Sequence, residues 1–253
     1  MKNNRWEQSL ENLRKREIEI VFEGIERNLG RGLELGAGSG FQSRLLINYL
    51  DLLVSTDLNV DRLPQDSSIG NIHYEILDAE KVGEKYNVDS FDFIFSSNLL
   101  EHLPNVKKCL EGVHKVMKQD GLVVHIVPSP GWRLLSVILH YPHKAQNLLI
   151  RIFRRSAPKR SRGNNLKVTR GVNSKIVDLL IPKAHGVSKN FVIEFFAFSR
   201  KRWVSVFESA GFEIIDVKRG PISSGYGFGF EKLKLFLHRF NFTTEYIYYM
   251  RRK

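Results

Sequence analysis

The stretch GRGLELGAGSGFQSRLL, residues 30–46, decides the fold because it joins a buried strand, a glycine-rich turn and the start of a helix. Its segment GLEL at 32–35 is typical of a short buried strand, and FQSRLLINYL at 41–50 predicts a helix. Five glycines fall within the first eleven residues. Glycine weakens regular structure, so this turn must need an unusual backbone conformation or the close approach of another group.

Strands and helices alternate on both sides of this turn. Apolar residues at helical spacing predict a helix over 5–29, and later helical segments are expected at 59–66, 105–118 and 199–212. Further strands are predicted at 52–57, 72–77, 91–97, 121–129, 213–219 and 245–252. This alternation predicts an α/β fold with a mostly parallel sheet of seven strands and helices on both faces.

Composition narrows the class of protein. The chain has 253 residues and a single cysteine, Cys109, so a disulfide framework or a multi-cysteine zinc cluster is excluded, and no metal is expected. No run of about 18 apolar residues is present, and the charged N-terminus lacks the apolar stretch of a signal peptide. We expect a cytoplasmic protein.

The positive charge is concentrated in one segment. The chain has a net charge of +12, yet residues 121–177 contain no Asp or Glu. The basic residues of this segment are Arg133, Lys144, Arg151, Arg154, Arg155, Lys159, Arg160, Arg162, Lys167, Arg170 and Lys175. Such a local excess indicates an anionic partner, and the pattern leaves phosphate, a membrane surface and nucleic acid open.

Acidic residues follow successive predicted strands close to the glycine-rich turn. Asp57 ends the second strand, where a carboxylate can accept both hydroxyls of a ribose. Asp78 follows the third strand, where it can reach the exocyclic amine of a purine. Either residue could instead cap a helix, since Asp is favoured at that position. Together with the glycines they predict a site for a nucleotide-shaped cofactor.

The motif series carries a family resemblance. LELGAGSG, Asp57, the segment DAE at 78–80, FDFIFSSNLLEHL at 91–103 and MKQDGLVVHIVPSP at 117–130 resemble class I S-adenosylmethionine (SAM) dependent methyltransferases, especially the branch with ubiquinone and menaquinone methyltransferases. The resemblance implies a Rossmann-like core with an antiparallel closing strand. It implies SAM as cofactor, with the methionine part at the turn, the ribose at Asp57, the adenine at Asp78 and Ala79, and the floor below the sulfonium at Ser97 and Asn98. The full set of expected cofactor-binding residues is Glu34, Gly36, Ala37, Gly38, Gly40, Asp57, Leu58, Asp78, Ala79, Ser97 and Asn98.

Two other enzyme classes use a similar turn. A dinucleotide-binding turn wants Gly or Ala three positions after its second glycine, and this chain has Phe41 there. Methyltransferases acting on nucleic-acid bases resemble the chain less, because their amino-methylating members carry Asn/Asp-Pro-Pro-aromatic after the fourth strand and this chain has SSNLLEHL. Carbon-methylating enzymes often need a cysteine nucleophile, whereas Cys109 falls within a predicted helix.

Two histidines are candidates for a general base. His102 follows Glu101 at the edge of the expected cofactor pocket, and His185 lies in the irregular stretch KAHGVSKNFVIEFF. Methylation of a hydroxyl requires removal of its proton, for which histidine is well suited. His102 could equally be a packing or capping residue, and His185 a hydrogen-bonded loop residue. An acceptor that is already an anion needs no base.

The segment between the fifth strand and the helix at 199–212 combines apolar and basic residues. We divide the chain into a SAM-binding core at 1–130, a basic, apolar lid at 131–198, and a C-terminal part at 199–253 that completes the core. Two short helices within 131–162 would suit an anionic lipid surface, and the alternative is that their apolar side packs on the domain.

These features predict transfer of a methyl group to a hydroxyl of an amphiphilic, lipid-linked or glycosyl small molecule. The alternatives are an RNA methyltransferase that grips phosphates with the basic segment, and a non-catalytic SAM-binding assembly module. The expected position is the cytoplasm, with peripheral contact at the inner face of the membrane.

Overall fold

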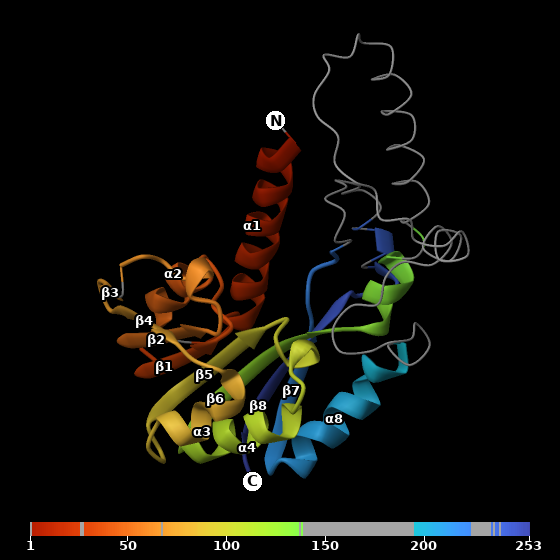
Figure 1. Ribbon diagram of the computed structural model, residues 1–253. Coiled ribbons are helices and arrows are strands. Elements are labelled where there is room, and N and C mark those ends of the chain that lie inside the picture. Colours follow the sequence, from red (N-terminus) through yellow and green to blue (C-terminus); the bar gives the residue numbers. More distant parts are fainter. Residues whose placement is uncertain are drawn as a thin grey trace, which may run out of the picture.

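The computed structural model describes residues 2–25, 28–66, 68–136, 138, 195–223, 234, 236, 237 and 239–253. In this part of the chain one sheet has eight strands in the order β3-β4-β2-β1-β5-β6-β8-β7 (Figure 1). The strands are β1 (Arg31–Leu35), β2 (Leu52–Asp57), β3 (Ser68–Ile69), β4 (Ile72–Ile76), β5 (Phe91–Ser97), β6 (Met117–Pro128), β7 (Phe212–Arg219) and β8 (Glu245–Arg252).

The helices that the structure describes from end to end are five α-helices and four short 3₁₀ helices. The α-helices are α1 (Lys2–Val21), α2 (Ser43–Leu46), α3 (Val82–Lys85), α4 (Val106–Val116) and α8 (Arg200–Ser209). The 3₁₀ helices are η1 (Ile47–Tyr49), η2 (Val60–Arg62), η3 (Ala79–Lys81) and η4 (Leu100–His102).

The sheet confirms the predicted α/β class. Strands β4, β2, β1, β5 and β6 are parallel, and β8 lies antiparallel between β6 and β7. The predicted count of seven strands is corrected to eight in the described chain, because the two-residue strand β3 pairs antiparallel with the edge of β4. Its sequence is too short to show a period of two, so the pattern gave no signal.

Two apolar cores lie on the two faces of the sheet. One contains Leu110 of α4 and Phe207 of α8, and the other contains Ile18 of α1 and Leu46 of α2. Neighbouring side chains of β6 alternate between them, since Val123 belongs to the first core and Val124 to the second. Burial on both faces explains why the central strands are nearly continuous apolar runs.

Two predicted helices are shorter in the structure than in the sequence pattern. The helix expected over 5–29 ends at Val21, and Gly24 then adopts a φ of +77°, which turns the chain toward β1. The helix expected over 41–50 is divided into the single turn α2 and the 3₁₀ helix η1. Both segments are helical where a helix was predicted, and their end points differ from the prediction.

Little of the basic, apolar segment lies in the described chain. Residues 130–136 are helical, and the only described basic residue of 121–177, Arg133, is buried. Leu135 is also buried, in a small core with Ile222, so at this position the apolar side packs on the domain. The other basic residues of the segment lie outside the described residues.

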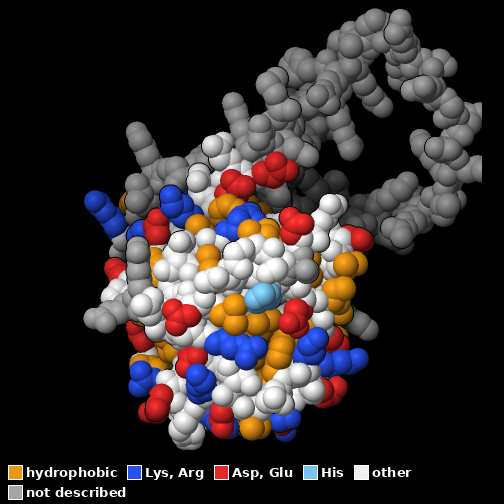
Figure 2. All heavy atoms as spheres, turned by 90° about the vertical axis from the view of Figure 1, so that its left-hand side faces the viewer, with side chains coloured by type: hydrophobic (Ala, Val, Ile, Leu, Met, Phe, Trp, Pro, Cys, Tyr) orange, Lys and Arg blue, Asp and Glu red, His pale blue; other side chains and the backbone are white. Residues whose placement is uncertain are grey.

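The rest of the chain is close to neutral. Outside 121–177 the net charge is +1, and Figure 2 shows acidic and basic side chains mixed on the face that bears the β3 edge. No described helix is long and apolar enough to cross a membrane. The concentration of charge seen in the sequence is therefore not repeated on this face.

Candidate functional site

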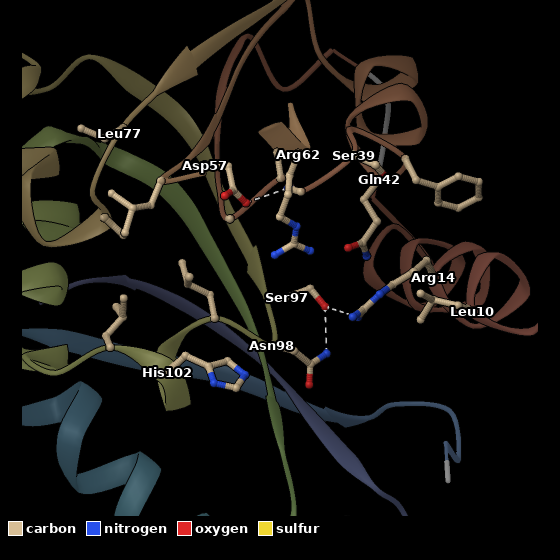
Figure 3. Close-up of a pocket in the computed structure, with 18 of the residues that line it drawn as sticks. Leu10, Arg14, Ser39, Gln42, Asp57, Arg62, Leu77, Ser97, Asn98 and His102 are labelled. Atoms are coloured by element: carbon tan, nitrogen blue, oxygen red, sulfur yellow. Dashed lines mark hydrogen bonds between the residues drawn. The ribbon is translucent and has the colours of Figure 1, made fainter. Parts of the chain in front are cut away.

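A cavity of about 810 Å³ opens where β1, β2, β4 and β5 end. Its volume falls in the range of about 300–1,000 Å³ that is usual for small-molecule and cofactor sites. Figure 3 shows its walls, with Leu10 and Arg14 on the side of α1 and His102 on the opposite side. Most of the predicted site residues line it, namely Gly36, Ala37, Gly38, Asp57, Leu58, Asp78, Ala79, Ser97, Asn98 and His102.

The glycine-rich turn is fixed to the end of β2. The amides of Gly36 and Ala37 both donate to the Thr56 carbonyl, at 2.7 and 2.9 Å. Gly36 and Gly38 have φ values of +78° and +56°, a region that other residues rarely adopt. Gly40 does not line the cavity, and a β-carbon there would lie 2.7 Å from the Tyr74 hydroxyl. The first two glycines therefore shape the cavity wall, and Gly40 allows close packing behind it.

Asp57 lies at the carboxyl end of β2 with its carboxylate oriented by the backbone. Its Oδ2 accepts a hydrogen bond from the Gly38 amide at 2.9 Å, and its Oδ1 accepts one from the Asn59 amide at 2.9 Å. An ionised carboxylate has about four acceptor positions, so each oxygen keeps one for a ligand. Leu58 follows with 70% of its surface exposed at the cavity edge. The pair could hold a ribose through hydroxyl donors and apolar contact.

Asp78 caps a helix and also lines the cavity. It is the N-cap of η3, where Oδ1 accepts from the Glu80 amide at 3.0 Å. It also lines the cavity, next to the buried Ala79. The capping hydrogen bond fixes the carboxylate and leaves acceptor positions for an amine donor.

Ser97 and Asn98 form the floor of the cavity at the end of β5. Asn98 adopts a φ of +50°, which is uncommon for a residue other than glycine. The Ser97 hydroxyl accepts from Arg14 Nη1 at 2.6 Å and from Asn98 Nδ2 at 3.1 Å, and it donates to Glu17 Oε2 at 3.0 Å. This network fixes the floor from the side of α1.

Sequence reasoning missed the contribution of α1 to the site. Arg14 lines the cavity, and its Nη1 also donates to both carboxylate oxygens of Glu17 at 2.8 Å. Gln42 Nε2 donates to Glu17 Oε2 at 2.9 Å. A signal was present, because Leu10, Arg14, Glu17 and Val21 are four, three and four residues apart. Charged residues on an apolar helical stripe indicate a buried polar contact.

Glu34 lies behind the turn and is not among the described residues that line the cavity. Its Oε2 accepts from Ser43 Oγ at 2.5 Å and from Ser55 Oγ at 2.9 Å, joining β1 to α2 and β2. Burial raises its pKa to about 7, and the two hydroxyl donors oppose that rise. In this structure the Glu34 side chain positions the turn.

His102 reaches the cavity from η4, and burial lowers its pKa. An imidazole with a lowered pKa is neutral near pH 7 and can accept a proton. Its Nε2 lies 3.8 Å from Oε1 of the buried Glu101. His185, the other predicted base, lies outside the described residues.

The charge of the cavity suits a cationic ligand. Its carboxylates come from Glu7, Glu11, Asp57, Asp78 and Glu80, against guanidinium groups from Arg14, Arg44 and Arg62. Arg62, also missed in the sequence, points into the cavity (Figure 3). A dinucleotide would bring two phosphates into this acidic lining, whereas SAM brings a sulfonium and an ammonium group. The excess of carboxylates in the cavity lining therefore fits SAM better than a dinucleotide.

Two other chemistries find no support among the described residues. No group of three or more potential metal ligands occurs there. Cys109 is buried on α4, and burial raises its pKa to about 12, so it forms no thiolate near neutral pH. Cys109 therefore contributes packing, as expected.

The sheet order, the antiparallel β8 and the cavity beside the glycine-rich turn agree with the fold and the site that the resemblance to class I SAM-dependent methyltransferases implies. Residues 33–125 match the family model for a methyltransferase domain. The chain is 28% identical over 108 residues to the uncharacterized methyltransferase YcgJ of Bacillus subtilis (strain 168), a match that covers 39% of this chain and 42% of that protein. A match to a highly reducing polyketide synthase of Pyrenophora dematioidea, 27% identical, covers 43% of this chain and 5% of that protein. The chain thus spans less than half the length of the curated relatives it matches.

Solved structures share the fold over nearly the whole chain. The S-adenosylmethionine-dependent methyltransferase from Mesorhizobium loti has a TM-score of 0.55 at 16% identity, with 93% of this chain and 98% of that chain covered. The YcgJ structure has a TM-score of 0.54 at 15% identity, with 94% and 98% covered. The [4+2]-cyclase SpnF has a TM-score of 0.52 at 12% identity, with 93% and 80% covered. The fold therefore also occurs in a protein described as a cyclase, and function must be argued from the site.

Proposed function

We propose that the chain is an active SAM-dependent methyltransferase that methylates a hydroxyl of an amphiphilic, lipid-linked or glycosyl small molecule. One observation carries the proposal. Asp57 and Asp78 lie at the ends of adjacent strands, around a glycine-rich turn, in one cavity with an excess of carboxylates. This is the chemistry that a ribose, a purine amine and a cationic group require.

The proposed cofactor residues divide by location. Gly36, Ala37 and Gly38 would lie against the methionine part, Asp57 and Leu58 against the ribose, and Asp78 and Ala79 against the adenine. Ser97 and Asn98 would form the floor below the sulfonium, while Glu34 and Gly40 support the turn from behind. When bound, SAM supplies an electrophilic methyl group. The chain itself has to align the acceptor and hold the proton that is released.

His102 is the proposed base. It lines the cavity, and its lowered pKa favours the neutral form that accepts a proton. A ring nitrogen of His102 would take the hydroxyl proton as the acceptor oxygen forms its bond to the methyl group. His185 stays a second candidate on sequence grounds alone.

The acceptor class is supported by the apolar side of the cavity. Leu10, Leu99, Leu103 and Pro104 line it on the side of α1 and η4, which favours an acceptor with an apolar portion. Leu134 and Ile138, next to the basic segment, are 46% and 56% exposed. Apolar and cationic residues together favour contact with an anionic lipid surface through 131–162, more than with nucleic acid.

Transfer of label from methyl-labelled SAM into a cell extract tests this function. The purified protein should place label in the lipid or glycan fraction, and the Asp57→Ala variant should place far less there. Label in RNA would instead support the RNA methyltransferase. SAM binding without label in any fraction would support a non-catalytic module or a different reaction on this fold.

A further inference from the structure

Glu101 is a buried carboxylate that the proposed cofactor site does not use. It lies on η4, with its side chain 1% exposed. Among the described residues no side chain hydrogen-bonds to either carboxylate oxygen, and the residue's own backbone amide is the one donor that opposes the rise in its pKa. A buried carboxylate without side-chain donors is costly unless a cation is nearby for at least part of the catalytic cycle. The ionised form of Glu101 therefore requires a neighbouring cation that stabilises it.

The charged groups around Glu101 come from three elements. They are Arg14 and Glu17 of α1, His102 of η4, and Glu245 at the start of β8. The charge of Arg14 favours the ionised form of Glu101, but Arg14 Nη1 is held by both oxygens of Glu17 at 2.8 Å and by Ser97 at 2.6 Å, and no hydrogen bond from Arg14 to Glu101 is described. Burial and the nearby Glu17 raise the pKa of Glu245 well above its usual range, which favours the neutral form of that residue.

His102 is the remaining group that can become a cation. Its Nε2 lies 3.8 Å from Glu101 Oε1, while 40% of its side chain is exposed at the cavity. At this separation, with Glu101 buried, an ionised carboxylate strongly favours a protonated imidazole. His102 can therefore act as a base whose protonated form is stabilised by the nearby Glu101 carboxylate.

We infer that Glu101 is a positioning residue that stabilises the protonated form of His102 during methyl transfer. The inference rests on the proposed function. As the acceptor O–H bond breaks, its proton forms an N–H bond on His102. The oxygen bonds to the methyl carbon, and the electron pair of the broken carbon–sulfur bond stays on sulfur. Glu101 balances the new charge on the ring without contacting the acceptor.

Burial raises the pKa of Glu101 to about 7. Below that pH Glu101 carries its own proton while His102 is neutral; a proton on His102 favours the ionised carboxylate, so the two groups titrate as a coupled pair. Above it the Glu101 carboxylate is ionised and can stabilise His102 when the ring accepts a proton. Turnover should therefore rise as the pH passes through about 7, and this rise should depend on Glu101.

NMR titration of the His102 ring in the full chain tests the pair without an acceptor. The signal is assigned by its loss in His102→Ala. Glu101→Gln should lower the pKa of His102 by about one unit or more, and Glu101→Asp should restore part of that shift. The matched control is Glu111→Gln, an exposed residue of α4 paired with Lys107, which should leave the His102 pKa unchanged.

An unchanged His102 pKa in a folded Glu101→Gln protein would overturn the inference. Turnover on the acceptor found by labelling gives a second readout. Glu101→Gln should lower kcat at least tenfold, remove the rise near pH 7 and leave KM for SAM unchanged. The proposed function fails separately, through absence of SAM binding or of label transfer in the unmodified protein.

Discussion

Two carboxylates, Asp57 in the cavity wall and Glu101 buried behind His102, are held in different ways. Asp57, at the end of β2, accepts one backbone amide on each oxygen. Glu101, on η4, has no side-chain hydrogen-bond donor among the described residues, and burial raises its pKa to about 7. The first carboxylate is fixed before any ligand arrives, whereas the second changes its charge near neutral pH beside His102.

This difference separates binding from chemistry in physical terms. A carboxylate fixed by amides can accept neutral hydroxyls at little cost in reorganisation. A buried carboxylate without side-chain donors changes its charge readily and can respond to a proton moving beside it. The β2 end of the cavity is therefore suited to holding a cofactor, and the η4 end to handling a proton.

The largest expected effect concerns the η4 end. His102→Ala should lower turnover by roughly 10²–10⁴-fold, because it removes the proposed general base. SAM affinity should stay nearly the same, since the base acts on the acceptor. The measurement is steady-state turnover on the acceptor identified by labelling, with His73→Ala as control, because His73 is exposed and contacts Ser68 at the far edge of the sheet. Full turnover of His102→Ala would place the base elsewhere.

The next effect concerns the support behind the turn. Burial raises the pKa of Glu34 from 4.5 to about 7, so the folded state holds its proton more tightly than the unfolded state. Stability from this group is complete below pH 4.5 and is lost as the pH rises to about 7, a change of about 3 kcal/mol. In Glu34→Gln the amide oxygen can still accept from Ser43 and Ser55. Urea unfolding at several pH values should show that the free energy of unfolding depends less on pH in this variant than in the unmodified protein. An identical pH dependence in the two proteins would contradict the raised pKa of Glu34.

A smaller effect is expected at the β2 end. Asp57→Ala should weaken SAM binding by about tenfold to a hundredfold, or roughly 1.5–3 kcal/mol, because it removes charged acceptors for ribose hydroxyls. The matched control is Asp61→Ala, an exposed residue of η2 that is not among the described lining residues. Isothermal calorimetry gives both affinities. Equal affinities in the two variants would show that the ribose lies elsewhere.

The smallest effects concern the basic, apolar segment. Contact with anionic lipid predicts that Arg151→Gln and Leu134→Ala each weaken sedimentation with anionic vesicles by about fivefold, or about 1 kcal/mol. Leu134 is preferred to Leu135, which is buried against the domain. If the segment binds RNA, Arg151→Gln should weaken RNA binding and Leu134→Ala should change it little. The affinity for RNA should then fall strongly with added salt. Salt-sensitive RNA binding without vesicle binding would reverse the choice of partner.

The β2 end of the cavity was predictable because its signals are local in the chain. Strands β2 and β5 were predicted at their observed bounds. Asp57 is the last residue of β2, and Asp78 lies two residues after the end of β4. Parallel strands bring such residues to one edge of the sheet without further information. The turn glycines could be predicted for the same reason, since a left-handed backbone strongly favours glycine.

The α1 side of the cavity depends on contacts between residues far apart in the chain. Arg14 and Ser97 are separated by 83 residues, and Glu17 and Ser97 by 80. Periodicity predicted α1 as a helix, but not that its stripe would carry a buried ion pair to the end of β5. Glu34 shows the reverse error, because a motif position suggested ligand contact and burial gave it a supporting role.

The most direct test of the central claim is calorimetric titration of the unmodified protein with SAM, with S-adenosylhomocysteine and with NAD. An acidic cavity with a fixed ribose acceptor predicts binding of SAM and S-adenosylhomocysteine in the micromolar range and no measurable binding of NAD. Binding of NAD in that range, with no binding of SAM, would contradict the account.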